Sequence, residues 1–128
     1  MNHLEGIVRE IHTDKDVSLI EILVDGSTFS ALTVSHDFQP GDQVSIEFKE
    51  TAMSLAKSIS GELSIRNRFD VIIDTLTPNN ILTKVILNFH GTRLVSTITT
   101  SSAERMQLKT GDRVEGLVKT TDMHLSKG

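Results

Sequence analysis

The sequence predicts an all-β fold: two tandem, OB-like, five-stranded Greek-key barrels, with a short helix in the second barrel. The first observation is an internal repeat, because residues 41–57 (GDQVSIEFKETAMSLAK) return as residues 111–127 (GDRVEGLVKTTDMHLSK) with 8 of 17 aligned positions identical. The second is apolar alternation with a period of two, which is typical of half-buried strands. The third is an insert with helix signals in the second repeat. Five short strands with a helix before the fourth or fifth are typical of OB barrels.

The first repeat shows strand patterns separated by turn residues. β-Branched and aromatic residues recur between the polar turns at residues 14–16, 25–26 and 40–42. The expected strands are Glu5–His12, Val17–Val24, Thr28–Val34 and Gln43–Phe48, followed by a short fifth strand.

The second repeat follows the same order of signals. Alternation is clearest from Ile81 to Phe89, where one face is expected to carry Ile81, Thr83, Val85, Leu87 and Phe89 and the other Leu82, Lys84, Ile86 and Asn88. The expected strands are Arg68–Leu76, Ile81–Phe89, Thr92–Thr99 and Arg113–Lys119.

The insert in the second repeat, residues 101–111 (SSAERMQLKTG), predicts a short helix. Ser101 followed three residues later by Glu104 fits a capping box. Met106 and Leu108 can turn inward, and Gly111 is suited to end the turn.

The repeats divide the chain into a first unit, residues 1–60, and a second unit, residues 61–128. A unit of about 60 residues buries only about 60% of its unfolded surface, so each would be marginally stable alone. We therefore expect the two repeats to share a core or to lean on other subunits.

Composition excludes several classes of protein. No apolar run approaches the roughly 20 residues of a membrane span, and the N-terminal MNHLEGIVRE has no export signal. The absence of cysteine excludes disulfides and thiolate metal sites, so a cytoplasmic location is expected. A net charge of −4 argues against a generally basic nucleic-acid surface.

Nucleic-acid binding by an OB barrel requires aromatic side chains on which bases stack. The chain has no Trp and no Tyr, and its five Phe lie mostly at alternating positions that point toward a core. The sequence therefore argues against a nucleic-acid partner.

Enzyme motifs are also absent. The five histidines are scattered and form none of the spacings of metal-dependent enzymes, and no GxSxG elbow or phosphate-cradling loop occurs. His12, Asp14 and Asp16 share one polar turn but lack the Gly and the distal Glu of a calcium loop, so a solvated turn is expected. We expect no enzymatic activity, no catalytic residues and no metal-ion site.

Hydrogen-bond donors suited to a tetrahedral oxyanion stand at three places in the second repeat. Arg and Lys add positive charge, hydroxyls add neutral donors, and a helix start adds free backbone N–H groups. The alternative interpretation is an ordinary Thr-rich strand surface with a linker arginine. The candidate residues are Ser64, Arg66 and Asn67 in SIRN, Thr99 to Ser102 in TTSS, and Lys119, Thr120 and Thr121 in KTT.

Together these segments resemble a known family. SIRN, IT at the close of the third strand, the Ser-rich helix start, LKTGD and VKTTDM are similar to the TOBE or Mop domain of molbindins and related molybdate-binding modules. The resemblance covers residues 64–125, and a weaker version covers residues 2–57. The chain thus resembles a tandem di-Mop protein.

The resemblance implies non-catalytic binding of molybdate or tungstate at interfaces between subunits or repeats, for intracellular storage and homeostasis. It places Ser64, Arg66, Lys119 and Thr120 at the site, with Thr99 and Ser102 as additional donors. It also implies a homo-oligomer, either a trimer or a dimer. No membrane partner is expected.

The first repeat departs from the family pattern. No Ser and Arg of SxRN precede Asn2, and Glu50 stands where the second repeat has Thr120. A carboxylate there is expected to repel an oxyanion, although Lys49 is still equivalent to Lys119. We therefore expect inequivalent sites, with Lys49 a weaker contributor.

Other functions are compatible with the same domain. One is the effector-sensing part of a molybdate-responsive transcription regulator or of an importer ATPase, and another is an OB-type module that binds protein or nucleic acid. The 128 residues contain neither a helix-turn-helix nor a Walker motif, which favours a storage protein.

Overall fold

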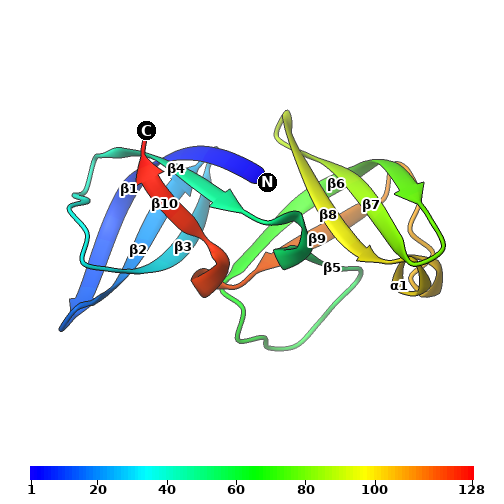
Figure 1. Ribbon diagram of the computed structural model, residues 1–128, viewed down its shortest axis with the longest axis horizontal. Helices are drawn as coiled ribbons and strands as arrows, with labels where there is room; N and C mark the ends of the chain where they lie inside the picture. Colours follow the sequence, from blue (N-terminus) through cyan, green and yellow to red (C-terminus); the bar gives the residue numbers. More distant parts are fainter.

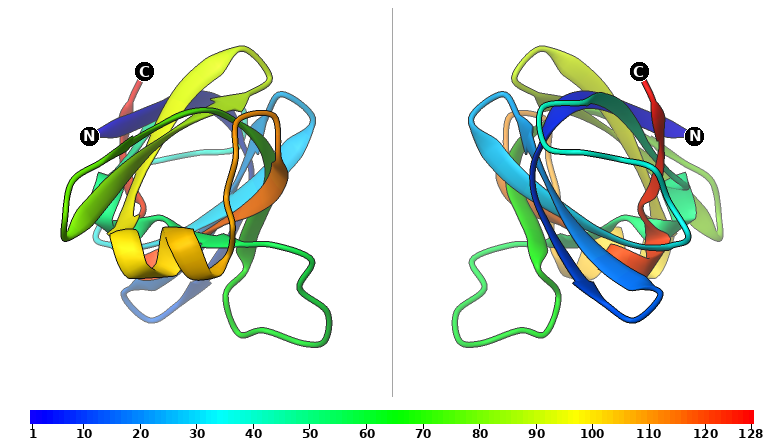
Figure 2. Two further views of the ribbon diagram at one scale, coloured as in Figure 1. Left: turned by 90° about the vertical axis from the view of Figure 1, so that its right-hand side faces the viewer. Right: turned by 90° about the vertical axis from the view of Figure 1, so that its left-hand side faces the viewer.

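The computed structural model describes residues 1–128 and confirms an all-β fold of two curled, five-stranded antiparallel sheets (Figures 1 and 2). The predicted strands are present, with their ends displaced by a few residues. The first repeat consists of β1 (Asn2–Asp14), β2 (Val17–Val24), β3 (Ser27–Val34), β4 (Gln43–Phe48), the 3-10 helix η1 (Glu50–Ala52) and β5 (Ser54–Ala56).

The second repeat has the same order of elements plus one α-helix. It consists of β6 (Asn67–Pro78), β7 (Leu82–Phe89), β8 (Thr92–Thr99), α1 (Thr100–Arg105), β9 (Arg113–Val118), the 3-10 helix η2 (Thr120–Asp122) and β10 (His124–Lys127). The long strands β1 and β6 each contain a register shift, at Val8/Glu10 and Ile73/Thr75. Such bulges bend a strand, so each long strand can take part in both halves of its curled sheet.

The two repeats exchange their last strands. The first sheet has the order β10-β4-β1-β2-β3, and the second has the order β5-β9-β6-β7-β8. Leu125 of β10 therefore lies opposite Ile46, and Leu55 of β5 lies opposite Gly116. In Figure 1 the C-terminal strand, drawn in red, lies beside β4 of the first sheet. The division at residues 60 and 61 follows the sequence repeat, and as a domain boundary it stays a prediction.

Two equivalent ion pairs hold the exchanged strands. Lys57, just after β5, donates to Asp112 of the second repeat at 3.3 Å, and Lys127 of β10 donates to Asp42 of the first repeat at 3.0 Å. These residues are the repeated GD turn and the repeated final lysine of the two 17-residue segments. Residues that are identical in the two repeats thus form the ion pairs between the exchanged strands and the other repeat.

The core is shared between the repeats, as the small size of each unit predicts. A single cluster of 23 buried residues draws on strands of both sheets. The ring of Phe29 from the first repeat lies 5.0 Å from that of Phe69 and 5.7 Å from that of Phe89, centroid to centroid. Aromatic pairs in this range add about 0.5–1.5 kcal/mol each beyond the area they bury.

The helix α1 begins earlier than the sequence predicts. Its N-cap is Thr99, whose hydroxyl accepts a hydrogen bond from the Ser102 N–H, so the predicted capping role of Ser101 is wrong. The reason is that β8 stays extended up to Thr99, which fixes where the first turn starts. Gln107, with φ of 53°, takes the left-handed position after the helix, and Gly111 belongs instead to the turn before β9. Leu108 is buried, as predicted.

The one α-helix spans six residues, and no helix of this structure has the length and apolarity needed to cross a bilayer.

The exchange predicts that neither repeat folds by itself as a monomer. A fragment of residues 61–128 lacks β5 beside β9 and leaves β10 without β4. We expect each fragment to be unfolded or self-associated, and equimolar fragments 1–60 and 61–128 to form a folded 1:1 complex, as followed by NMR spectra and sedimentation. A stable monomeric fragment would show that the exchange is dispensable.

The two ion pairs of the exchange also predict a pH dependence of stability. The Lys127 ammonium and the Gln39 N–H lower the pKa of Asp42, while the Lys109 N–H and Lys57 lower the pKa of Asp112. A carboxyl with a lowered folded-state pKa stabilises the fold above its unfolded pKa of about 3.9, and this contribution is lost as pH falls through the folded value.

We therefore expect an Asp42→Asn, Asp112→Asn double variant to have a lower urea midpoint than the parent protein at pH 7, and this gap to shrink toward pH 3. Asp74→Asn serves as the control, because Asp74 is exposed and has no ion-pair partner. An equal gap at both pH values would contradict the assignment.

Candidate oxyanion site

The exchange creates two equivalent junctions between the repeats. In what we name the first junction, the start of β1 and η1 pack against β8; in the second junction, the start of β6 and η2 pack against β3. The backbone matches closely, because Lys49 before η1 has φ/ψ of −69°/148° and Lys119 before η2 has −66°/148°. Both junctions lie in the middle of the molecule, between the two sheets (Figure 1).

The second junction brings together the two predicted cationic ligands. Asn67 lies opposite Val118 in the β6–β9 ladder, so Arg66 and Lys119 continue from adjacent strand ends at the same edge. Lys119 is exposed and has no ion-pair partner, whereas the Arg66 guanidinium lies 3.7 Å from Glu21. Thr120 and Thr121 follow in η2. Charge and hydroxyl donors from two distant segments thus meet at one place.

Ser64 lies in the segment between β5 and β6, which loops away from both sheets (Figures 1 and 2). Its side chain is exposed and makes no hydrogen bond within the chain. It stands two residues before Arg66, near the second junction in sequence. Its role as a ligand stays a prediction.

Asn67 has a different environment from the other candidates. It is 1% exposed, and its amide group bonds both backbone groups of Ser30, accepting from the N–H at 2.7 Å and donating to the carbonyl at 2.9 Å. Asn2 does the same at the first junction, with both bonds to Val95 at 2.8 Å. Each Asn therefore hydrogen-bonds the backbone of an edge strand that belongs to the other repeat. Ligation by Asn67 stays a prediction, in competition with this structural role.

Thr99 and Ser102 lie apart from the second junction. They cap α1, which packs against β7 and β8 at the far end of the second sheet from η2 (Figure 1). The Thr99 hydroxyl donates to Ser102 Oγ at 2.9 Å, and Arg105 approaches the same oxygen at 3.4 Å. A site that combined these donors with Lys119 needs a second chain.

The first junction carries Lys49, which is exposed and has no ion-pair partner. Glu50 follows it, at the position of Thr120, and its carboxylate lies among donors from other segments of the chain. Glu50 is thus one of the predicted differences between the two repeats, beside the missing counterparts of Ser64 and Arg66.

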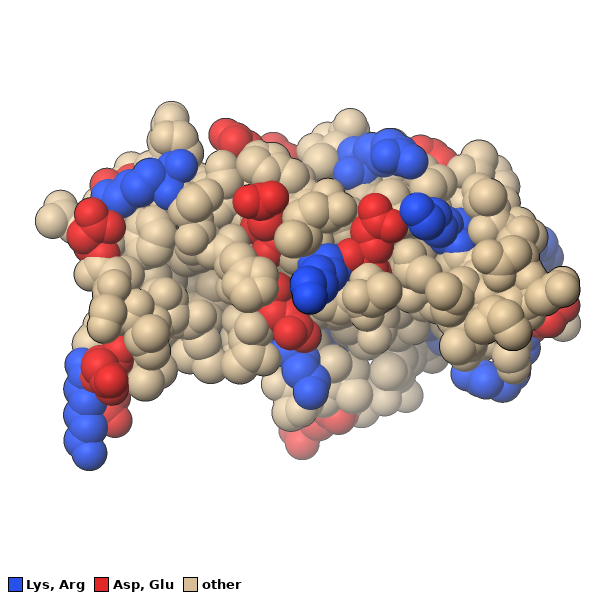
Figure 3. Space-filling view, viewed as in Figure 1, with Lys and Arg blue, Asp and Glu red and all other residues tan.

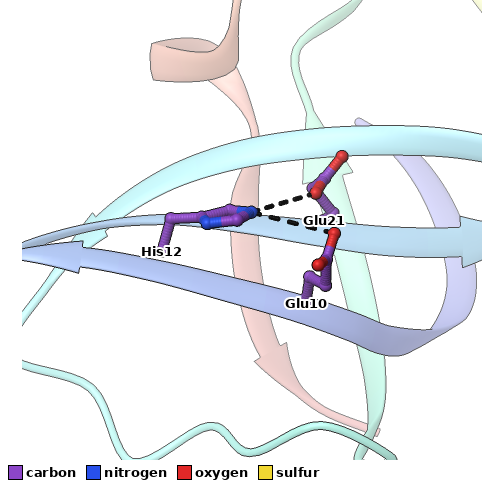
Figure 4. Close-up of side chains that lie close together, drawn as sticks. All are labelled: Glu10, His12 and Glu21. Atoms are coloured by element: carbon purple, nitrogen blue, oxygen red, sulfur yellow. Dashed lines mark hydrogen bonds and ion pairs between the residues drawn. The ribbon is translucent and has the colours of Figure 1, made fainter.

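The side chains of His12, Asp14 and Asp16 do not converge on one point. His12 instead approaches Glu21 at 3.3 Å and Glu10 at 3.8 Å (Figure 4). Sequence reasoning missed this group because Glu10 and Glu21 become neighbours only through the β1–β2 register. A hydrogen bond with Glu10, the contact with His12 and the charge of Arg66 lower the pKa of Glu21. The group thus forms an exposed ion-pair network that reaches the second junction through Arg66.

Binding of single-stranded nucleic acid requires exposed aromatic side chains on which bases stack. Four of the five Phe side chains are buried, and Phe38 is half-buried against His36. On the face shown in Figure 3, Lys and Arg are interspersed with Asp and Glu over a mostly uncharged surface.

Comparison with known proteins defines the class. Residues 63–125 match the TOBE domain model. A solved structure of ModG, described as a cytoplasmic molybdate-binding protein with molybdate bound, aligns with a TM-score of 0.93 and 21% identity over 99% of this chain and 96% of ModG. At that identity the likeness shows the fold alone. A molybdate-binding protein from Sporomusa ovata is 31% identical over its whole length, which corresponds to 52% of this chain, with a TM-score of 0.51.

The fold and these matches define a protein that contains a TOBE domain in its second repeat. More particularly, the chain belongs to the molbindin, or Mop, family and is a tandem of two Mop units. Both matched structures are described as binding proteins rather than enzymes, in agreement with the predicted non-enzymatic role. A comparison with curated protein sequences found no match.

The environment of Asn67 predicts that its replacement lowers stability. In Asn67→Ala, the N–H and carbonyl of Ser30 would both lose their partner at a buried position. An unsatisfied buried polar group costs about 1–3 kcal/mol, so we expect a loss of at least about 2 kcal/mol in the free energy of unfolding by urea. Asn80→Ala, at an exposed position with no side-chain hydrogen bond, is the control. An unchanged stability with weakened anion binding would instead identify Asn67 as a ligand.

Proposed function

We propose that this protein binds molybdate or tungstate reversibly, without catalysis, at the second junction, and serves intracellular molybdate storage and homeostasis. The observation that carries the proposal is that β6–β9 pairing places Arg66 and Lys119 at one strand end beside the hydroxyls of η2. Membership of a family whose matched members are described as molybdate-binding supports the choice of anion.

The charges of the second junction suit a dianion. An anion taken from water must be paired and hydrogen-bonded, or its desolvation outweighs the attraction. One Arg and one Lys match the two negative charges of molybdate. Ser64, Thr120 and Thr121 add neutral hydroxyl donors, and each can donate one hydrogen bond to an oxyanion oxygen.

The donor set also discriminates among anions. Molybdate carries no proton at neutral pH, so all of its oxygens can accept from the Arg, Lys and hydroxyl donors, whereas hydrogen phosphate must also place its own proton on an acceptor. Sulfate is likewise a proton-free dianion, so only cavity size and donor distances can reject it. Tungstate is nearly the size of molybdate, and we expect both to bind.

We further propose that the complete site forms in a closed homo-oligomer. In one chain the candidate donors are divided between the second junction and the distant start of α1, and the side chains of Lys119 and Ser64 are exposed. Exposed apolar side chains are also present, among them the cross-strand pair of Val17 and Val34. Burial of such surface between subunits would dehydrate the site and strengthen its ion pairs.

The test is titration calorimetry of the anion-stripped protein with molybdate, tungstate, sulfate and phosphate. We expect micromolar or tighter binding of the first two and weak binding of the others. Arg66→Ala and Lys119→Ala should each lose about 2–5 kcal/mol, at least about 30-fold in affinity, because each leaves a buried charge without its partner.

Two variants control this experiment. Arg93→Ala removes an exposed cation of β8 that has no ion-pair partner and should not alter affinity. Lys49→Ala should have a smaller effect than Lys119→Ala, and equal losses would show that the first junction is a full site. Tight binding by a protein that sediments as a monomer would contradict the oligomeric site.

A further inference from the structure

The Glu50 carboxylate at the first junction is held by donors from three other segments of the chain. Its Oε1 lies 3.6 Å from Lys84 Nζ of β7 and accepts from the Thr97 hydroxyl of β8 at 3.5 Å. Its Oε2 lies 3.6 Å from the Met1 amino nitrogen, ahead of β1. The side chain is only 28% exposed. We propose that Glu50 is a tethered anion that fills the first junction in place of an oxyanion, and that this junction is a latent second oxyanion site.

This inference rests on the proposed function and extends it to the first repeat. The two junctions have the same scaffold, because Asn2 bonds Val95 as Asn67 bonds Ser30. The residues that close the 3-10 helices also agree, with φ/ψ of −93°/116° at Met53 and −91°/121° at Met123. The side chain that follows the equivalent lysines differs, because it is Glu50 in one junction and Thr120 in the other. The first junction also has no counterpart of Arg66, and Lys84 of β7 supplies a cation there instead.

The cations and the hydroxyl around Glu50 are the groups that would bind an oxyanion, and the Glu50 carboxylate occupies their common contact position. Lys49 and Lys84 each supply a positive charge at or beside the junction, and Thr97 supplies a hydroxyl. The second junction likewise has two cations, Arg66 and Lys119, but the residue equivalent to Glu50 is the neutral Thr120. Its nearby carboxylates are Asp122 of η2, which forms no ion pair, and Glu21, which lies 3.7 Å from Arg66. A carboxylate on the chain neutralises part of this charge permanently, at no entropic cost of capturing a free ion, and so competes with a dissolved dianion.

An ordinary surface ion pair would account for one contact but not for this convergence. Exposed pairs bring together two side chains and are worth little. Here two oxygens of one half-buried carboxylate face donors that come from the start of the chain, β7 and β8. Removal of the carboxylate leaves Lys84 and the Met1 amino group without their anionic partner, beside Lys49, which has none. That is the condition for recruiting an oxyanion from solution.

The test is the number of molybdate ions bound per chain, measured by titration calorimetry of the full-length protein. Glu50→Thr installs the residue found at the equivalent position of the second repeat, and Glu50→Gln removes only the charge. We expect each to raise the stoichiometry by one site per chain and a further Lys84→Ala to abolish the added site. Glu47→Gln, which removes a carboxylate with no ion-pair partner from β4, should leave the stoichiometry unchanged.

The same variants in an Arg66→Ala, Lys119→Ala background isolate the first junction. If the parent protein binds molybdate and the Glu50 variants bind the same number of ions, the latent site is refuted while the proposed function stands. If the parent binds none and Glu50→Thr binds one, the second junction is refuted and the latent site stands. No binding by either would overturn both. Far-UV circular dichroism of each variant confirms that the compared proteins are folded.

Discussion

The pairing of β5 with β9 and of β10 with β4 is the constraint on which the rest of the structure depends. Each sheet receives its edge strand from the other repeat, so the 3-10 helix that precedes that strand must cross to the other sheet. This crossing places η1 on β8 and η2 on β3, and with them Lys49 and Lys119. The junctions are therefore products of the exchange, and a single repeat contains neither. A shared core of 23 residues follows from the same crossing.

The local structure could be predicted from sequence because it depends on near neighbours. Alternation with a period of two identifies the strands, since each has one buried and one exposed face. The exchange could not be predicted, because the repeats carry the same GD turn and the same final lysine. Lys57 has the right spacing for Asp42 of its own repeat and for Asp112 of the other, and only the length and path of the chain through η1 select Asp112. Identical local sequence gives no information on that choice.

The candidate site shows the same division between local and nonlocal information. The proximity of Arg66 to Lys119 follows from the pairing of β6 with β9, in which Asn67 lies opposite Val118. Asn67 appears in sequence as one more polar donor, yet its amide is engaged by Ser30 of a strand that belongs to the other repeat. The recurrence of Asn at the starts of β1 and β6 was the available signal. Thr99 and Ser102 are donors that α1 uses for its own N-terminus, which explains why the motif is present far from the second junction.

Duplication of one fold makes the backbone of the two junctions equal, so their chemical difference rests on side chains. Dihedral angles at Lys49 and Lys119 agree within a few degrees, and the edge-strand bonds of Asn2 and Asn67 are the same. With the scaffold fixed, the sign of the charge at one position decides whether a junction is neutralised from within the chain or must take an ion from solution. Such a change costs little stability, because a carboxylate placed among existing cations and hydroxyls finds partners for both of its oxygens. Under the proposal made for Glu50, a carboxylate at this position thus removes one anion site without any change of fold.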